Sequence, residues 1–286
     1  MKVGFTSMNT PRDIATDVLA RELEGRGFDS LWVGEHPQIP VSRLTPYPAG
    51  DPMPEQYKWM MDPFLSLLLA AHATTDLLIG TGVALPLEHD IFDLAKTAAT
   101  LDRLSGGRLL FGVGVGWNEE ELANAHRASW PARYRALSEA VAALRSLWCD
   151  DESEHHGEFY DFDKVWSLPK PQQQPHPPVY CGAGGRVGMR HAVEWADGWM
   201  PVDVALGNVP KKIGLFRAAL ADAGRDPESV GITLVTFGNP ELATLASYRE
   251  CGVERVVVGA ARENWDDPAS TLPFLDTYAE MVSALA

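Results

Sequence analysis

The sequence predicts an α/β protein with the fold of a (β/α)8 TIM barrel, in which residues 1–286 form one domain. Short apolar runs alternate along the whole chain with segments of helical periodicity, which favours a parallel sheet. Eight such pairs can be assigned, and the length suits a barrel of this kind, typically about 250 residues. An open doubly wound sheet is the alternative, because it has the same alternation.

Each predicted strand is a short apolar run that ends in glycine or polar residues, as expected for parallel strands covered on both faces. The clearest run reads LLIGTGVALPLEHD and spans Leu77 to Asp90; it becomes glycine-rich and then polar at its carboxyl end. The eight strands are expected at residues 2–6, 28–33, from 77, 108–113, 179–181, 199–202, 232–237 and 256–259.

A segment with apolar residues at helical spacing follows each strand. Several of these segments begin with residue types that favour helix N-termini, and glycines mark many of their ends. Helices are expected after Thr10-Pro11, after Asp62-Pro63, after Asp90, from 131 to 148, after Gly185, from Pro210, after Asn239-Pro240 and up to Leu285.

Two irregular segments interrupt the alternation. The proline-dense stretch 37–61 follows the second strand and is too rich in aromatic residues for a free linker, so we expect a partly ordered lid. Residues 157–170 alternate polar and aromatic residues, which predicts a small hairpin before the fifth strand, and His155-His156 is expected in a solvated turn before it. Lid and hairpin are both expected to shape the substrate pocket.

Charge and composition disfavour several kinds of partner and binding site. A net charge of −15 without a basic run disfavours nucleic acid as a partner. The sequence has no run of about 18 apolar residues and no signal-peptide pattern, so we expect no membrane contact and a cytoplasmic location. Three cysteines in no ligand spacing are expected as reduced thiols, and the histidines show no metal-binding motif.

In a barrel, the carboxyl ends of all strands meet at one mouth. The residues expected there are Ser7, Glu35-His36, Gly82, Glu88-His89, Gly114, Gly116, Trp117, Gly182 to Arg186 and Asp203. Glycines at four strand ends predict a flat ligand across the mouth; tight turns are the simpler explanation. Trp117 is the one tryptophan placed to contact a cofactor.

Two groups at the mouth carry chemistry. Gly182-Ala-Gly-Gly-Arg186 opens a helix, which predicts a phosphate cradle, whereas a dinucleotide fingerprint fails because Val187 replaces the third glycine or alanine. His36, paired with Glu35, could donate or accept a proton near neutral pH, or could simply be satisfied by loop hydrogen bonds.

The chain resembles the bacterial-luciferase-like oxidoreductases, within them the branch that depends on the deazaflavin coenzyme F420. The matching segments are FDSLWVGEH, LLIGTGVALPLEHD with the following LAKTAATLDRLSGGRLLFGVGVGWNEEE, and PPVYCGAGGRVGMRHAVEWADGWMP. The resemblance implies a non-prolyl cis peptide at or near Gly82-Val83, a catalytic pair Glu35-His36, and phosphate contacts from Gly184 and Gly185. The predicted cofactor-binding residues are Ser7, Thr81, Gly82, Val83, Gly114, Trp117, Ala183, Gly184, Gly185 and Arg186.

The resulting hypothesis is hydride transfer between F420 and a small organic substrate under the lid, with His36 exchanging a proton. Arg186, Lys211 and Lys212 are candidates for the anionic cofactor tail. Trp117 occupies the place where some F420 enzymes carry an acid. The alternatives are an FMN-dependent monooxygenase supplied by a separate flavin reductase, a flavin-binding protein without turnover and, as an outlier, a nicotinamide dehydrogenase. The family also makes a homodimer possible.

Overall fold

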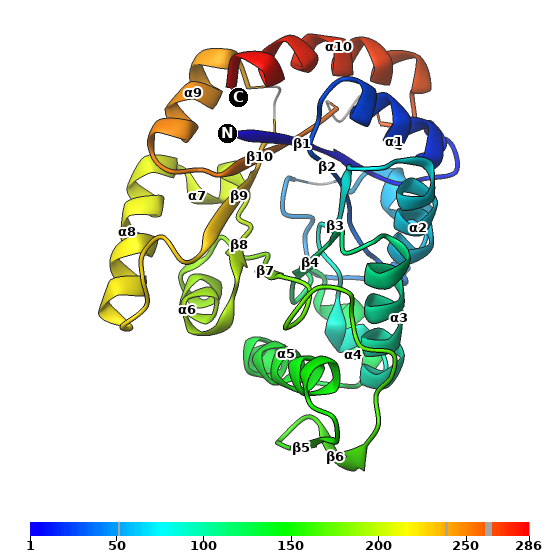
Figure 1. The fold of residues 1–286 in the computed structure, drawn as a ribbon, viewed down its shortest axis with the longest axis vertical. Coiled ribbons are helices and arrows are strands. Elements are labelled where there is room, and N and C mark those ends of the chain that lie inside the picture. Colours follow the sequence, from blue (N-terminus) through cyan, green and yellow to red (C-terminus); the bar gives the residue numbers. More distant parts are fainter. Residues whose placement is uncertain (51, 238–239, 261–264, 286) are drawn as a thin grey trace.

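The computed structural model describes residues 1–50, 52–237, 240–260 and 265–285. Within these ranges, eight parallel strands close into a barrel in the order β1-β10-β9-β8-β7-β4-β3-β2, with the helices outside it (Figure 1). Because β1 pairs with both β2 and β10, the predicted barrel is confirmed and an open sheet is excluded. The strands are β1 (Lys2–Ser7), β2 (Ser30–Val33), β3 (Leu78–Thr81), β4 (Leu109–Val113), β7 (Val179–Cys181), β8 (Gly198–Trp199), β9 (Gly231–Val235) and β10 (Arg255–Gly259).

Helices follow the strands in the predicted order. They are α1 (Thr16–Gly25), α2 (Pro63–Ala73), α3 (Ile91–Leu104), α4 (Glu119–Ala125), α5 (Arg133–Cys149), α6 (Arg186–Trp195), α7 (Asp203–Leu206), α8 (Val209–Asp222), α9 (Leu242–Glu250) and α10 (Pro268–Leu285). Asp62 and Asp90 cap α2 and α3 as predicted, since their carboxylates accept first-turn amides.

Three helix predictions need correction. Thr10 does not cap α1, because its hydroxyl bonds the carboxylate of Asp266 and accepts the amide of Arg12, and the helix starts only at Thr16. Helices α4 and α7 were not expected at all. Helix α9 begins at Leu242 after Glu241; the predicted cap residue Asn239 lies outside the described residues.

Aromatic side chains fill the barrel interior, and glycines on neighbouring positions make room for them. A Cβ added to Gly80 would lie 2.4 Å from the ring of Trp32, and one added to Gly198 would lie 2.2 Å from the ring of Tyr180. These two rings meet edge to face, with centroids 5.7 Å apart. The interior is therefore a packed core that closes the barrel below its mouth.

The lid segment after β2 contains the 3₁₀ helix η1 (Glu55–Trp59) and returns to the barrel at Met61. Met61 donates its amide to the carbonyl of Asn9, whose side-chain amide donates back to the Met61 carbonyl. The predicted lid insertion is thus confirmed, and it is anchored to the loop after β1.

The hairpin before the fifth barrel strand is also confirmed: β5 (Ser153–His156) pairs antiparallel with β6 (Asp161–Val165). It starts earlier than predicted, because His155 and His156 belong to its first strand and not to a turn. Figure 1 shows it beyond α5, away from the barrel centre. None of its residues lines the cavity described below, so its predicted role in shaping the pocket is wrong.

Among the described residues, no helix combines the length and the apolar character that crossing a membrane requires. The three cysteines are free thiols, as expected.

Candidate active site

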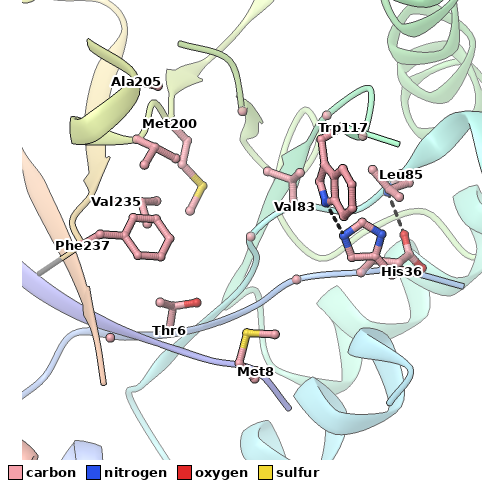
Figure 2. Close-up of a pocket in the computed structure, with 18 of the residues that line it drawn as sticks. Thr6, Met8, His36, Val83, Leu85, Trp117, Met200, Ala205, Val235 and Phe237 are labelled. Atoms are coloured by element: carbon pink, nitrogen blue, oxygen red, sulfur yellow. Dashed lines mark hydrogen bonds between the residues drawn. The ribbon is translucent and has the colours of Figure 1, made fainter. Parts of the chain in front are cut away.

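A cavity of about 410 Å³ opens at the carboxyl ends of the strands. Its walls come from nearly every strand end and from the lid, and most of them are apolar. In Figure 2, His36 and Trp117 lie on one side of it, and Met200, Val235 and Phe237 lie on the other. The remaining lining residues include Thr6, Ser7, Met8, Gly34, Glu35, Tyr57, Met60, Gly82, Val83, Leu85, Gly114, Val115, Gly116, Gly182, Ala183, Gly184, Ala205, Thr236 and Trp265.

The Gly82–Val83 peptide bond is cis, as the resemblance implied, and Val83 lies at the centre of the cavity wall (Figure 2). Glycines on the next two strands accommodate its side chain. A Cβ on Gly114 would approach the Val83 methyls to 2.7 Å, and one on Gly182 would approach them to 2.5 Å. These two glycines therefore make room for the chain's own Val83, which explains their presence without a ligand.

His36 is held by hydrogen bonds at both ring nitrogens. Its Nδ1 lies 2.7 Å from Glu121 Oε2, and Trp117 Nε1–H donates to its Nε2 over 3.1 Å. A carboxylate only accepts and an indole N–H only donates. The neutral tautomer with the proton on Nδ1 is therefore the form that satisfies both partners, and Nε2 is an acceptor at the cavity wall.

The predicted pairing of Glu35 with His36 is wrong, although both residues line the cavity. Glu35 Oε1 lies 2.8 Å from His89 Nε2, and its Oε2 accepts the amide of Leu85 over 2.7 Å. Both carboxylate oxygens of Glu35 are thus occupied by partners other than His36.

Behind this wall lies a cluster of acids and histidines. Burial, reinforced by the charges of Glu121 and Glu35, raises the pKa of Glu88 to about 8. Burial lowers the pKa of His89, but the hydrogen bond and charge of Glu35 outweigh it and leave that pKa above its ordinary value. At neutral pH, Glu88 is therefore largely protonated and His89 carries more positive charge than a free histidine would.

Sequence reasoning missed Glu121, which is fully buried. A signal was present: Asn118 and Glu121 have the spacing of a helix cap followed by an acid at the third helical position. Asn118 indeed caps α4 by accepting the Glu121 amide, but the Glu121 side chain turns to His36 instead of back to the cap.

The lid adds a further set of aromatic side chains that the sequence did not place. The ring of Tyr57 lies 5.3 Å from that of His36 and 6.4 Å from that of Trp265, both measured between centroids. The hydroxyls of Tyr47 and Tyr57 are 3.1 Å apart. Together with Trp117, these rings cover His36 on the lid side.

Several predicted site residues lie outside the cavity wall. Thr81 is buried and donates its hydroxyl to the carbonyl of Gly112. Asp203 accepts backbone amides at the start of α7. Gly185 and Arg186 form the exposed start of α6, which has no side-chain cap, and Glu88 and His89 lie behind the wall.

The other predicted residues do line the cavity: Ser7, Gly82, Val83, Gly114, Gly116, Trp117, Gly182, Ala183 and Gly184, besides Glu35 and His36. The strand-two pair and the loop after β7 therefore face one cavity, as expected for a common mouth. Among the residues that the structure describes, no group of three or more His, Cys, Asp or Glu is arranged to hold a metal ion.

Among the proteins similar in sequence to this chain are three described next. Rv0953c, an uncharacterised protein of Mycobacterium tuberculosis H37Rv, is 38% identical over 94% of this chain and 95% of its own length. The F420-dependent hydroxymycolic acid dehydrogenase of the same organism is 28% identical over 74% of this chain and 55% of its own length. The oxygenase component of the flavin-dependent trigonelline monooxygenase of Acinetobacter baylyi is 33% identical over 68% and 50%, so the matches cover about half of these last two proteins.

A solved structure shares the fold: that of an F420-dependent secondary alcohol dehydrogenase in complex with an F420–acetone adduct, with a TM-score of 0.79 and 19% identity over 100% of this chain and 99% of that one. The model of the luciferase-like monooxygenase family matches residues 8–240. The chain therefore belongs to the luciferase-like monooxygenase family.

Proposed function

We propose that this protein is an F420-dependent oxidoreductase that transfers a hydride between the deazaflavin and a small organic substrate, with His36 exchanging the accompanying proton. The observation that carries the proposal is the placement of His36, which lines the same cavity as Val83 and has an acceptor nitrogen in its ring. A planar redox ring and a proton-exchanging group would therefore meet at one place.

The cavity fits a ring of this kind. Its volume of about 410 Å³ lies within the range of roughly 300–1,000 Å³ for small-molecule sites. Its walls are mostly apolar, and the Val83 side chain lies between Met200 and His36 in Figure 2. Bound there, F420 would supply the hydride donor or acceptor, which no amino-acid side chain provides.

The anionic part of the cofactor would lie toward the loop between β7 and α6. Helix α6 begins without a side-chain cap, which leaves the amides of its first turn available to a negative group. A Cβ on Gly185 would meet no atom within 4 Å, so the approach is open. Arg186 and, on the first turn of α8, Lys211 and Lys212 would supply positive charge on this acidic protein.

His36 would exchange the proton through Nε2. In the structure this nitrogen accepts from Trp117, so the substrate's polar hydrogen would take the place of the indole N–H. Since most of the cavity wall is apolar and includes Met8, Met60, Leu85, Phe237 and Trp265, the rest of the substrate would be apolar and uncharged. The lid would exclude water from the same space.

The relatives support a cofactor of this class, because one is named for F420 and another for flavin. They also favour one alternative, an FMN-dependent monooxygenase that receives reduced flavin from a separate reductase. A non-catalytic flavin-binding barrel is the second alternative.

Titration of the purified protein with F420 and with FMN tests the cofactor, with quenching of tryptophan fluorescence as the signal, since Trp117 and Trp265 line the cavity. We expect tighter binding of F420. A clear preference for FMN would favour the monooxygenase instead.

The His36→Ala variant tests catalysis. Absorbance of F420 is followed with a panel of apolar alcohols and carbonyl compounds, and we expect kcat to fall by about 10²- to 10⁴-fold, the usual contribution of a general acid or base. Cofactor affinity should stay unchanged. Unchanged turnover in this variant would show that His36 does not carry the proton.

A further inference from the structure

The buried carboxylate of Glu121 makes one hydrogen bond among the described residues. Its Oε2 lies 2.7 Å from His36 Nδ1, and its Oε1 is buried without a hydrogen-bond partner among the described residues. A buried carboxylate normally has both oxygens satisfied, and each exception needs an explanation. The side chain is fully buried, so water offers little compensation.

The backbone around Glu121 is fixed on two sides. Its amide donates to Asn118 Oδ1 over 3.4 Å, and its carbonyl accepts from Gln38 Nε2 over 3.0 Å. Asn118 is itself buried, and Gln38 belongs to the lid. The carboxylate thus projects from a pinned position toward one imidazole nitrogen.

The opposite ring nitrogen is constrained independently. Trp117 is a donor only, so Nε2 of His36 has to be unprotonated for the 3.1 Å contact to be a hydrogen bond. If Nε2 carried a proton, two N–H groups would point at each other. Glu121 from α4 and Trp117 from the loop before it therefore specify the same tautomer.

We propose that Glu121 is a positioning residue that fixes His36 as the Nδ1–H tautomer, so that Nε2 is the atom that exchanges a proton with the substrate. This inference rests on the proposed role of His36 in catalysis. It assigns Glu121 no contact with substrate, because its carboxylate does not line the cavity. It also explains why the chain keeps a half-satisfied carboxylate in its interior.

The tautomer can be measured without turnover. Protein labelled with ¹⁵N-histidine is examined by NMR above neutral pH, and the His36 signals are identified by their loss in His36→Gln. We expect a protonated Nδ1 and an unprotonated Nε2 in the unsubstituted protein. In Glu121→Leu, which removes the acceptor, we expect a mixture of tautomers, whereas Glu121→Gln keeps a carbonyl acceptor and should retain most of the Nδ1–H form.

Kinetics on the same proteins complete the test. Glu121→Leu should lower kcat by about 10- to 100-fold, part of the usual effect of general acid–base catalysis, without changing KM or F420 affinity. Glu121→Gln should lie between Leu and the unsubstituted protein. Glu119→Gln is the matched control, because it removes one charge from an exposed position of the same helical turn.

A His36 that is mainly protonated at Nε2 in the unsubstituted protein would overturn the inference, as would an unchanged kcat in Glu121→Leu. A different result would contradict the proposed function itself, namely unchanged turnover in His36→Ala. Since leucine replaces a buried, half-satisfied charge, Glu121→Leu should fold, and Glu121→Gln serves as the second variant in any case.

Discussion

The two ends of the barrel bury charge in opposite ways. At the end where the strands begin, Arg255 is 1% exposed and donates from Nε to Asp29 Oδ2 over 2.8 Å. Ser30 donates its hydroxyl to the other Asp29 oxygen, and Trp32 donates its indole N–H to Ser30. Opposite charges are paired, and the hydrogen bonds continue into the barrel core.

At the mouth, three carboxyl groups share one cluster with two histidines. Burial, reinforced by the charges of Glu121 and Glu35, raises the pKa of Glu88 to about 8, and one Glu121 oxygen has no partner among the described residues. Such a cluster is a poor source of stability. At the end where the strands begin, opposite charges are thus paired, whereas at the mouth like charges lie close together and the pKa of Glu88 is strongly raised.

The largest expected loss of stability is at the end of the barrel where the strands begin. Arg255→Met would leave Asp29 without its cationic partner, and removing one member of a buried pair typically costs about 3–5 kcal/mol of unfolding free energy. Chemical denaturation measures this loss. If charge is paired favourably only at the end where the strands begin, Glu121→Leu at the mouth lowers the unfolding free energy by less than Arg255→Met does. Equal losses in the two variants would contradict this difference between the two ends.

A smaller loss of stability is expected where Val83 packs against Gly182 at the mouth. In Gly182→Ala the new Cβ would lie 2.5 Å from a Val83 methyl, and overpacking of this kind costs about 1–3 kcal/mol. Thermal unfolding reports the loss of stability. Gly185→Ala is the matched control on the same loop, because its Cβ would meet no atom within 4 Å; a similar loss in both variants would argue against packing as the cause.

A further effect is a pH dependence of stability at the mouth. Because folding raises the pKa of Glu88 from 4.5 to about 8, the folded protein keeps a proton that the unfolded chain releases, so this residue makes stability fall as pH rises between these values. Glu88→Gln removes the dependence. We expect the melting temperature of the unsubstituted protein to fall relative to that of the variant from pH 5 to pH 8.

The raised pKa of His89 acts in the same direction, since its contribution is present below pH 6.5 and is lost as pH rises through the folded value. His89 is kept in both proteins, so their difference isolates Glu88. A difference in melting temperature that does not change between pH 5 and pH 8 would show that Glu88 titrates normally.

The partner of His36 illustrates where sequence reasoning ended. Glu35 is the neighbour in the chain, but its carboxylate contacts His89 and the amide of Leu85. The true partner, Glu121, lies 85 positions away on a helix that was not predicted. Helix α4 has only seven residues, which is too short for a helical repeat of apolar residues to be recognised in the sequence.

The sequence by itself determined the features that depend on local pattern. These are the eight apolar strand runs, the caps at Asp62 and Asp90, the lid, and the presence of Glu35 and His36 at a strand end, because periodicity and capping act within a few residues. Tertiary structure alone decided which groups meet: Glu121 and Trp117 at His36, Val83 against Gly114 and Gly182, and Arg255 with Asp29. Barrel closure brings together residues far apart in the chain, and the side to which each side chain turns follows from packing that no local pattern encodes.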